Sequence, residues 1–339
     1  MPRSIRHHTM AATALALAVT LASAAPVGAT DLRHPTPATA HTHITAAYEL
    51  PGDRVYPEGI AAAPRTGELY VGSYTNGTIY RITPRHRTAE VFLPAGTDGR
   101  HTANGLKVDG AGRLWVTDST AGVAVYDIRS RRLLARFDVP GDSASFVNDV
   151  TIAPDGSAYL TDSVRTVVYR VTPGELARTA AGDRRGTLTT RFDLSGTVGP
   201  HPAGTFTLNG IVADPSGRYL LTPDMTGGDL FRIDLASGTA RRVTLHGGDM
   251  RHADGLELRH GTLWAAHNTT NTITRWHLTD DGRTARMERR VTDEALQIPT
   301  TLVRQNGRTL VVRSQFDKGG PMGPGTPETP FTVAAVRGI

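Results

Sequence analysis

The sequence contains no cysteine, and lysine occurs only at Lys107 and Lys318. The absence of cysteine excludes disulfides, thiolate catalysis and metal sites with cysteine ligands. The net charge of +5 comes almost entirely from arginines, which are scattered along the chain. Aromatic residues make up only 6% of the chain and do not alternate with a basic cluster, so we expect no nucleic-acid partner.

The N-terminus has the pattern of an export signal. Two arginines precede an apolar run over residues 10–25, and the small residues that follow fit cleavage near Ala29. We therefore predict a signal peptide over residues 1–29, a flexible leader over residues 30–43 and a secreted mature protein. The run is short for a membrane span, and no other segment approaches eighteen apolar residues, so no stable span is expected after cleavage. An uncleaved anchor is the alternative.

A unit of about 45 residues recurs six times along the rest of the chain. Each unit opens with a polar residue, usually followed by glycine, and continues with short strands separated by glycine-containing turns. The openings are Glu58-Gly59, Asn104-Gly105, Asn148-Asp149, Asn209-Gly210, Asp254-Gly255 and a degenerate sixth near Thr300. They are 44 to 46 residues apart, except that 61 residues separate Asn148 from Asn209, which indicates a loop insertion around 176–206.

Units of this length with four short strands predict the blades of an all-β, six-bladed β-propeller over residues 44–339. The last unit has only three clear strands and ends with the strand 331–336. The segment 47–51 resembles the fourth strands of the other units. We therefore expect this N-terminal segment to pair with the last blade, because that pairing closes the ring and covers an exposed sheet edge.

The opening residues should lie at one level around the central channel, because the innermost strand of each blade lines it. Five of these six positions hold carboxylates or carboxamides, and none holds lysine, arginine, histidine or cysteine. Hard divalent cations prefer such oxygen ligands, and Ca²⁺ tolerates an irregular coordination geometry. The pattern favours one bound divalent cation, and Ca²⁺ before other divalent cations. The alternative is that these residues only form turns, as Asn-Gly and Asp-Gly often do.

The motifs Pro57–Ala61, Phe146–Val150, Leu208–Ile211 and Ala253–Leu256, in this order and spacing, resemble the SMP-30/gluconolactonase/luciferin-regenerating-enzyme (LRE) family. The resemblance covers about residues 45–336. It implies six blades and a divalent cation in the channel. Carried over to this chain, it makes Glu58, Asn209 and Asp254 metal ligands, and Asn148 a substrate contact or a further ligand. Asp149 follows Asn148 as in the family's Asn-Asp pair.

The substrate-binding residues depart from the family pattern. The arginine that the family carries shortly before the Asn-Asp pair is absent, and Ser145-Phe146-Val147 stands there, which puts gluconolactone itself in question. The paraoxonase-like members carry a histidine at the second opening, where this chain has Asn104. We expect Asn104, Asn148 and Asp149 to contact substrate, together with His101 at the rim of the channel.

These expectations add up to a secreted, metal-dependent lactonase or ester hydrolase with a small-molecule substrate. The cation would polarise the carbonyl group, and Asp254 would orient or deprotonate a water molecule. His201 and His252 are further candidates, and His252 would share a strand face with Asp254. Two alternatives stay open: a non-catalytic binding propeller of the NHL type, and an enzyme like the strictosidine synthases or virginiamycin B lyases. The sequence does not predict an oligomeric state.

Overall fold

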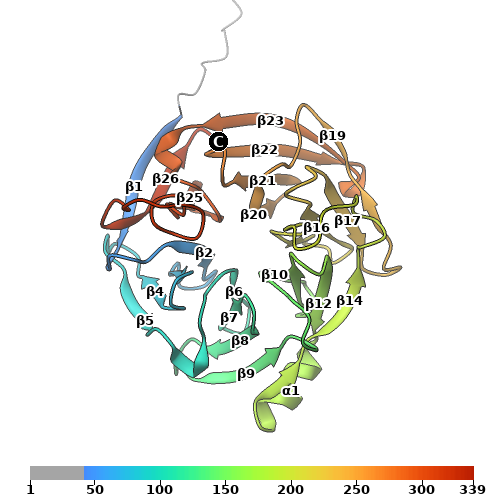
Figure 1. Cartoon of the computed structure of the whole chain (residues 1–339), viewed down its shortest axis with the longest axis horizontal. Helices are drawn as coiled ribbons and strands as arrows, with labels where there is room; N and C mark the ends of the chain where they lie inside the picture. Colours follow the sequence, from blue (N-terminus) through green and yellow to red (C-terminus); the bar gives the residue numbers. More distant parts are fainter. Residues whose placement is uncertain (1–41) are drawn as a thin grey trace, which may run out of the picture. The chain divides into compact units, whose positions relative to one another are not determined.

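The computed structural model describes residues 42–339, which form six small sheets arranged in a ring (Figure 1). The predicted signal peptide and residues 30–41 of the predicted leader lie outside the described residues. Within each sheet, the strand that comes first in the repeat lies nearest the centre of the ring. The prediction of an all-β, six-bladed β-propeller is therefore confirmed.

The first three blades follow the chain from the centre of the ring outward. Blade 1 comprises β2 (Pro57–Ala62), β3 (Leu69–Ser73), β4 (Ile79–Ile82) and β5 (Glu90–Leu93). Blade 2 comprises β6 (Leu106–Val108), β7 (Arg113–Asp118), β8 (Gly122–Asp127) and β9 (Leu133–Asp138). Blade 3 comprises β10 (Val147–Ile152), β11 (Ala158–Asp162), β12 (Val167–Val171) and β14 (Thr189–Asp193).

The other three blades repeat this order. Blade 4 comprises β15 (Val212–Ala213), β16 (Tyr219–Pro223), β17 (Leu230–Asp234) and β18 (Ala240–Arg242). Blade 5 comprises β20 (Ala253–Arg259), β21 (Thr262–His267), β22 (Thr272–Thr279) and β23 (Thr284–Thr292). Blade 6 comprises β24 (Leu302–Gln305), β25 (Arg308–Val312) and β26 (Phe331–Arg337), with β1 (His43–Leu50) as its outermost strand.

The prediction of four strands in every blade is wrong for two blades. β13 (Arg185–Thr187) pairs parallel with β9 at the edge of blade 2, and β19 (Thr244–His246) pairs parallel with β23 at the edge of blade 5. β13 and most of helix α1 (Pro173–Ala181) belong to the segment that we expected to be a loop insertion. Three single turns of 3-10 helix complete the described structure: η1 (Thr97–Gly99), η2 (Asp280–Gly282) and η3 (Glu294–Leu296).

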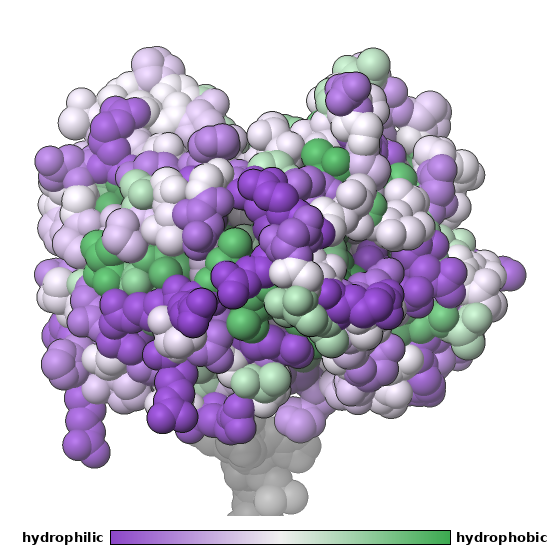
Figure 2. Space-filling model, turned by 90° about the horizontal axis from the view of Figure 1, so that it is seen from below, coloured by the Kyte–Doolittle hydropathy of each residue, from purple (hydrophilic) through white to green (hydrophobic). Residues whose placement is uncertain are grey.

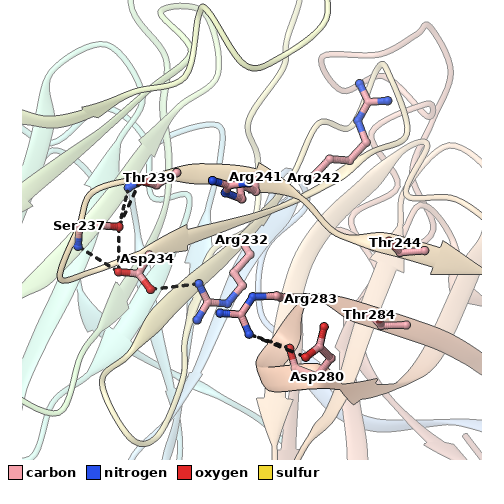
Figure 3. Close-up of a pocket in the computed structure, with 10 residues that line it drawn as sticks. All are labelled: Arg232, Asp234, Ser237, Thr239, Arg241, Arg242, Thr244, Asp280, Arg283 and Thr284. Carbon is pink, nitrogen blue, oxygen red and sulfur yellow. Dashed lines mark hydrogen bonds and ion pairs between the residues drawn. The ribbon is translucent and has the colours of Figure 1, made fainter.

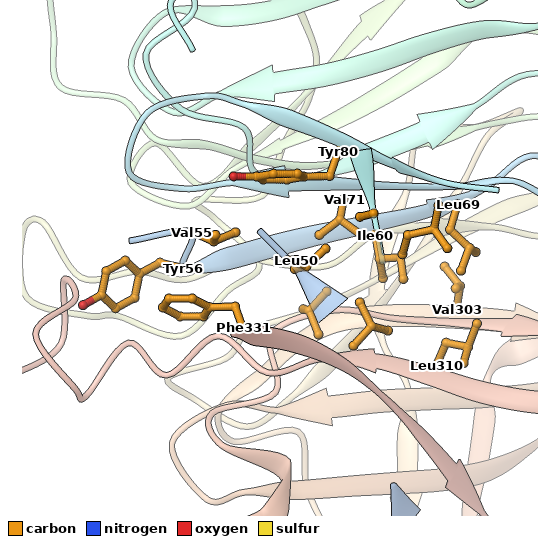
Figure 4. Packing of buried hydrophobic residues seen from close by; sticks show 14 of the residues in the cluster. Leu50, Val55, Tyr56, Ile60, Leu69, Val71, Tyr80, Val303, Leu310 and Phe331 are labelled. Atoms are coloured by element: carbon orange, nitrogen blue, oxygen red, sulfur yellow. The ribbon is translucent and has the colours of Figure 1, made fainter. Parts of the chain in front are cut away.

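The first and last blades share one apolar core. β1 runs antiparallel to β26, from His43 opposite Arg337 to Leu50 opposite Phe331. Buried side chains from blades 1 and 6 pack together between the two sheets (Figure 4). They include Leu50, Tyr56, Ile60, Val303, Leu310 and Phe331. Burying one such side chain contributes roughly 1.5–3 kcal/mol, so this seam adds substantially to the stability of the ring.

The glycines that follow the opening residues allow neighbouring blades to approach closely. Their φ angles are not positive, so they do not form the turns that the alternative interpretation required. A Cβ atom on Gly210 would overlap the carbonyl oxygen of Asp254 in the next blade, and one on Gly255 would lie 2.8 Å from that of Thr300. The backbone N–H of Gly210 donates to the same Asp254 oxygen over 3.0 Å. The glycines therefore set the level of the opening residues around the channel.

The outer surface seen edge-on in Figure 2 is mostly hydrophilic, with small apolar patches between hydrophilic side chains. In residues 42–339, no helix has the length and apolar character needed to cross a membrane.

Candidate functional site

The opening residues of five blades meet in one cavity of about 310 Å³. Its polar lining consists of buried side chains from blades 1 to 5: Glu58, Asn104, Asn148, Asn209, Asp254 and Asn268. The opening residue of blade 6, Thr300, does not line the cavity. Its hydroxyl donates to the carbonyl oxygen of Glu58 over 2.7 Å and so links blade 6 to blade 1.

The side chains of Asn104 and Asn148 are oriented by serines that directly follow the second strand of their own blade. Asn104 donates through Nδ2 to Oγ of Ser119, and Asn148 donates to Oγ of Ser163, both over 3.0 Å. The Oδ1 atoms of Asn104 and Asn209 are buried and have no hydrogen-bond partner among the described residues. Buried acceptors of this kind cost free energy unless a ligand satisfies them.

The carboxylates of the site are strongly perturbed. Burial raises the pKa of Asp254 to about 8, and the nearby charge of Asp149 adds to this shift, while Asn268 opposes it by a hydrogen bond. Burial also raises the pKa of Glu58 well above its usual range, and Asp254 and Asp149 reinforce the shift. Oε2 of Glu58 has no hydrogen-bond partner in the described structure. The site is therefore short of positive charge.

This donor set fits a hard divalent cation. It offers two carboxylates and the carboxamide oxygens of Asn104, Asn148 and Asn209, which are ligands of the kind that Ca²⁺ takes. Within residues 42–339, no group of three or more His, Asp or Glu side chains is arranged to hold a metal ion. A cation here would therefore depend on the asparagines as well as on Glu58 and Asp254.

The four residues predicted as metal ligands, Glu58, Asn148, Asn209 and Asp254, all line the cavity, as does Asn104. Asp149 and His101, which were also predicted to contact substrate, do not line the cavity.

Asp149 lies behind the cavity wall, where four other blades have the glycine of their opening motif. Its carboxylate accepts hydrogen bonds from the backbone N–H groups of Val150 and Ile211. Since Ile211 belongs to the next blade, Asp149 connects two blades. The side chain of His101 is exposed, and its backbone N–H donates to Oδ2 of Asp118 over 3.0 Å.

The candidate histidines also lie outside the cavity lining. His201 contacts Oδ2 of Asp224 through Nε2 over 2.7 Å, at the end of the second strand of blade 4. The expectation that His252 shares a strand face with Asp254 is wrong, because His252 precedes β20 with a φ of 59° and is exposed, whereas Asp254 is buried.

Asn268 is a site residue that was not predicted from the sequence, and its Nδ2 donates to Oδ2 of Asp254 over 2.8 Å. The repeat nevertheless contains a pattern from which Asn268 could have been predicted. In five blades, a residue 14 to 16 positions after the opening residue contacts that opening residue. The five contacting pairs are Asn104 with Ser119, Asn148 with Ser163, Asn209 with Met225, Asp254 with Asn268, and Thr300 with Ser314.

A larger cavity of about 460 Å³ lies at the outer strands of blades 4 and 5 and is lined by four arginines and several hydroxyl groups (Figure 3). Most of its positive charge is already paired: Arg232 with Asp234 and Asp281, Arg283 with Asp280, and Arg242 with Asp229. This larger cavity therefore lacks the unsatisfied polar groups that distinguish the cavity lined by the opening residues.

Comparisons with known proteins agree with this fold. A sequence model described as the SMP-30/gluconolactonase/LRE-like region matches residues 56–299. None of the curated proteins compared with the chain matches it.

Solved structures match over most of their length. One is a gluconolactonase, XC5397 from Xanthomonas campestris (16% identity, TM-score 0.59, 88% of this chain and 90% of that chain). Another is the allergen Mala s 1 from Malassezia sympodialis (16%, 0.59, 86% and 95%). A third is virginiamycin B lyase from Staphylococcus aureus (13%, 0.54, 87% and 99%). At these identities the likeness shows the fold alone.

Proposed function

Because the chain belongs to the SMP-30/gluconolactonase/LRE-like family, we propose that it is a cation-dependent hydrolase of lactones or related carboxylic esters. The observation that supports this most directly is the set of unpartnered, buried acceptor oxygens on Glu58, Asn104 and Asn209, which lie in one cavity with Asp254. A protein that used the channel only as structural core would leave such atoms unsatisfied at a cost of about 1–3 kcal/mol each.

We assign the cation to Glu58, Asn209 and Asp254, with Asn148 as a further ligand or a substrate contact. Ca²⁺ bound there would supply Lewis acidity that polarises a substrate carbonyl group. Asn104 and Asn148 each give one Nδ2 hydrogen to a serine, so the second hydrogen of each amide can be donated to a substrate oxygen.

Asp254 is the residue we assign to the attacking water. The hydrogen bond from Asn268 orients its carboxylate within a buried site. A carboxylate held in this way can orient a water molecule and accept its proton as the water attacks a carbonyl carbon. The proton then goes to the alkoxide that leaves when the ester bond breaks, which balances the hydrolysis.

We also propose that the protein is secreted, on the basis of the predicted signal peptide. The test is the mass of the protein recovered outside the cells, which should correspond to a chain that begins near Thr30. A mass that includes residues 1–29 would support an uncleaved anchor instead.

The function is tested by pH-stat hydrolysis of aldonic, aromatic and acyl-homoserine lactones, with chelator and with added Ca²⁺. We expect chelation to abolish turnover and Ca²⁺ to restore it. Asp254→Asn should lower kcat by roughly 100-fold or more. Asp280→Asn is the matched control, since Asp280 is largely exposed and lies in the outer part of blade 5.

Two outcomes count against the proposal. Full turnover by Asp254→Asn would exclude the assigned role of Asp254. No turnover in protein that holds one cation per chain would favour a lyase or a binding propeller.

A further inference from the structure

The cavity changes from polar to apolar toward its opening. Its carboxylate and carboxamide residues are at most 6% exposed. Three large apolar side chains are exposed among the described residues, and two of them, Phe206 at 42% and Met322 at 47%, line this cavity. Exposed apolar surface gathered at one opening is typical of a binding site.

The apolar residues form two walls that come from opposite sides of the ring. Phe146, just before β10 in blade 3, packs against Phe206, just before blade 4, with ring centroids 4.7 Å apart. Tyr74, after β3 in blade 1, packs against Phe316, after β25 in blade 6, with centroids 5.3 Å apart. In a ring of six, blades 3 and 4 face blades 6 and 1. A ligand entering the cavity therefore passes between two aromatic pairs.

The opening offers few groups that could replace water around a hydrophilic ligand. In the part of the chain that the structure describes, no lysine, arginine or histidine lines the cavity. Pro321 and Met322 extend the wall formed by Tyr74 and Phe316. A hydroxyl group moved from water into such an opening loses hydrogen bonds without compensation, whereas an alkyl or aromatic group gains contacts.

From this arrangement we infer that the substrate is a lactone or ester that carries an alkyl or aromatic group, which lies between the aromatic pairs while its carbonyl group reaches the polar end. A cavity of about 310 Å³ is small for a ligand site, so the apolar group is short. The inference rests on the proposed function for the reaction, and on the shape and lining of the cavity for the ligand.

The test compares three six-membered lactones: unsubstituted δ-valerolactone, its butyl derivative δ-nonalactone, and polyhydroxylated glucono-δ-lactone. We expect kcat/KM for the butyl derivative to exceed that for δ-valerolactone by at least roughly tenfold. Phe206→Ala should lower kcat/KM for the butyl derivative by roughly tenfold and thereby reduce this ratio. Val91→Ala is the control, because Val91 is 46% exposed and lies outside the cavity, and it should change neither value.

Comparison of variants on one substrate removes the intrinsic reactivity of each lactone from the result. A preference for glucono-δ-lactone over the butyl derivative in the wild-type protein would overturn the inference, as would a ratio that Phe206→Ala leaves unchanged. Either result would leave the proposed hydrolase function standing.

A second measurement covers the case in which no lactone is hydrolysed, which would count against the proposed function. Binding of the butyl-substituted δ-lactam, which resists hydrolysis, is then measured by calorimetry against the unsubstituted lactam. The inference of an apolar ligand would be supported if the butyl lactam binds more tightly than the unsubstituted lactam and if Phe206→Ala weakens that binding. Equal binding of the two lactams, or no binding of either, would overturn the inference that the ligand carries an apolar group.

Discussion

Nδ2 of Asn268 donates a hydrogen bond of 2.8 Å to Oδ2 of Asp254, while Oδ1 of Asn268 accepts a hydrogen bond of 2.6 Å from the backbone N–H of Thr269. The second bond fixes which end of the amide faces Asp254. Asn268 is therefore a positioning residue for the carboxylate that we assign to the cation and to the attacking water.

Asn268→Leu should lower the affinity for Ca²⁺ or kcat by roughly 10- to 100-fold, the usual effect of removing a group that orients a ligand. Calorimetric titration with Ca²⁺ and steady-state hydrolysis measure the two quantities. Thr269→Ala is the control, because Thr269 is exposed. Unchanged Ca²⁺ affinity and kcat in Asn268→Leu would show that Asp254 needs no such support.

Gly210→Ala should destabilise the propeller by roughly 1–3 kcal/mol, because the added Cβ would overlap the carbonyl oxygen of Asp254 in the next blade and lie 2.9 Å from the backbone nitrogen of Leu256. Urea unfolding measures the change. Gly196→Ala is the matched control, since a Cβ there meets no atom within 4 Å. Equal stability of both variants would mean that the blades can move apart at no cost.

The ring of opening residues could be predicted from the sequence because the repeat itself carries the information. Equivalent positions in consecutive blades lie at one level, so Glu58, Asn209 and Asp254 had to meet once the period was recognised. Asn268 was recoverable in the same way, from its offset after Asp254. The glycine in Asn209-Gly210 was harder to interpret, because turn formation and close approach select the same residue.

The walls of the cavity could not be predicted in this way. Phe206 and Phe316 lie in connecting segments that do not repeat, so their convergence depends on how those segments fold over the channel. The added strands β13 and β19 depend likewise on parallel pairing between segments that are 49 and 40 residues apart, for which no local pattern exists. Asp149 has an appropriate side chain for a site, but its burial behind the wall follows from packing alone.

Ca²⁺ should stabilise the folded protein if the channel binds it. A concentration one hundred times the Kd adds about 2.7 kcal/mol, which corresponds to a rise in Tm of roughly 5 °C. Glu58→Gln should abolish this rise without lowering the Tm of the cation-free protein, since it removes a buried carboxyl group next to Asp254. Differential scanning calorimetry with and without chelator measures both effects.

Glu49→Gln provides the matched control for that substitution, because Glu49 is exposed in β1. It should retain the full Ca²⁺-dependent rise in Tm. A wild-type Tm that does not respond to Ca²⁺ or to other divalent cations would exclude the assigned cation site.

His267 is buried as a neutral imidazole at the end of β21. Its Nε2 lies 2.8 Å from Oγ1 of Thr274, which also accepts a hydrogen bond from Nε1 of Trp276. The Thr274 hydroxyl hydrogen is therefore free to be donated to Nε2. Nδ1–H of His267 then donates to the carbonyl oxygen of Arg251 over 2.7 Å. Burial lowers the pKa of His267 to about 4, from an ordinary value of 6.5.

Since the unfolded chain takes up a proton at His267 near pH 6.5 and the folded chain does so only near pH 4, stability should fall as the pH drops through this window. The loss amounts to roughly 3 kcal/mol for the full shift, and all of this stability is present above pH 6.5. His267→Asn should flatten the dependence of the free energy of unfolding on pH between 6.5 and 4, as measured by urea unfolding. His277→Asn, at an exposed position on β22, should keep the wild-type slope. If His267→Asn keeps that slope as well, another group accounts for the loss of stability in acid.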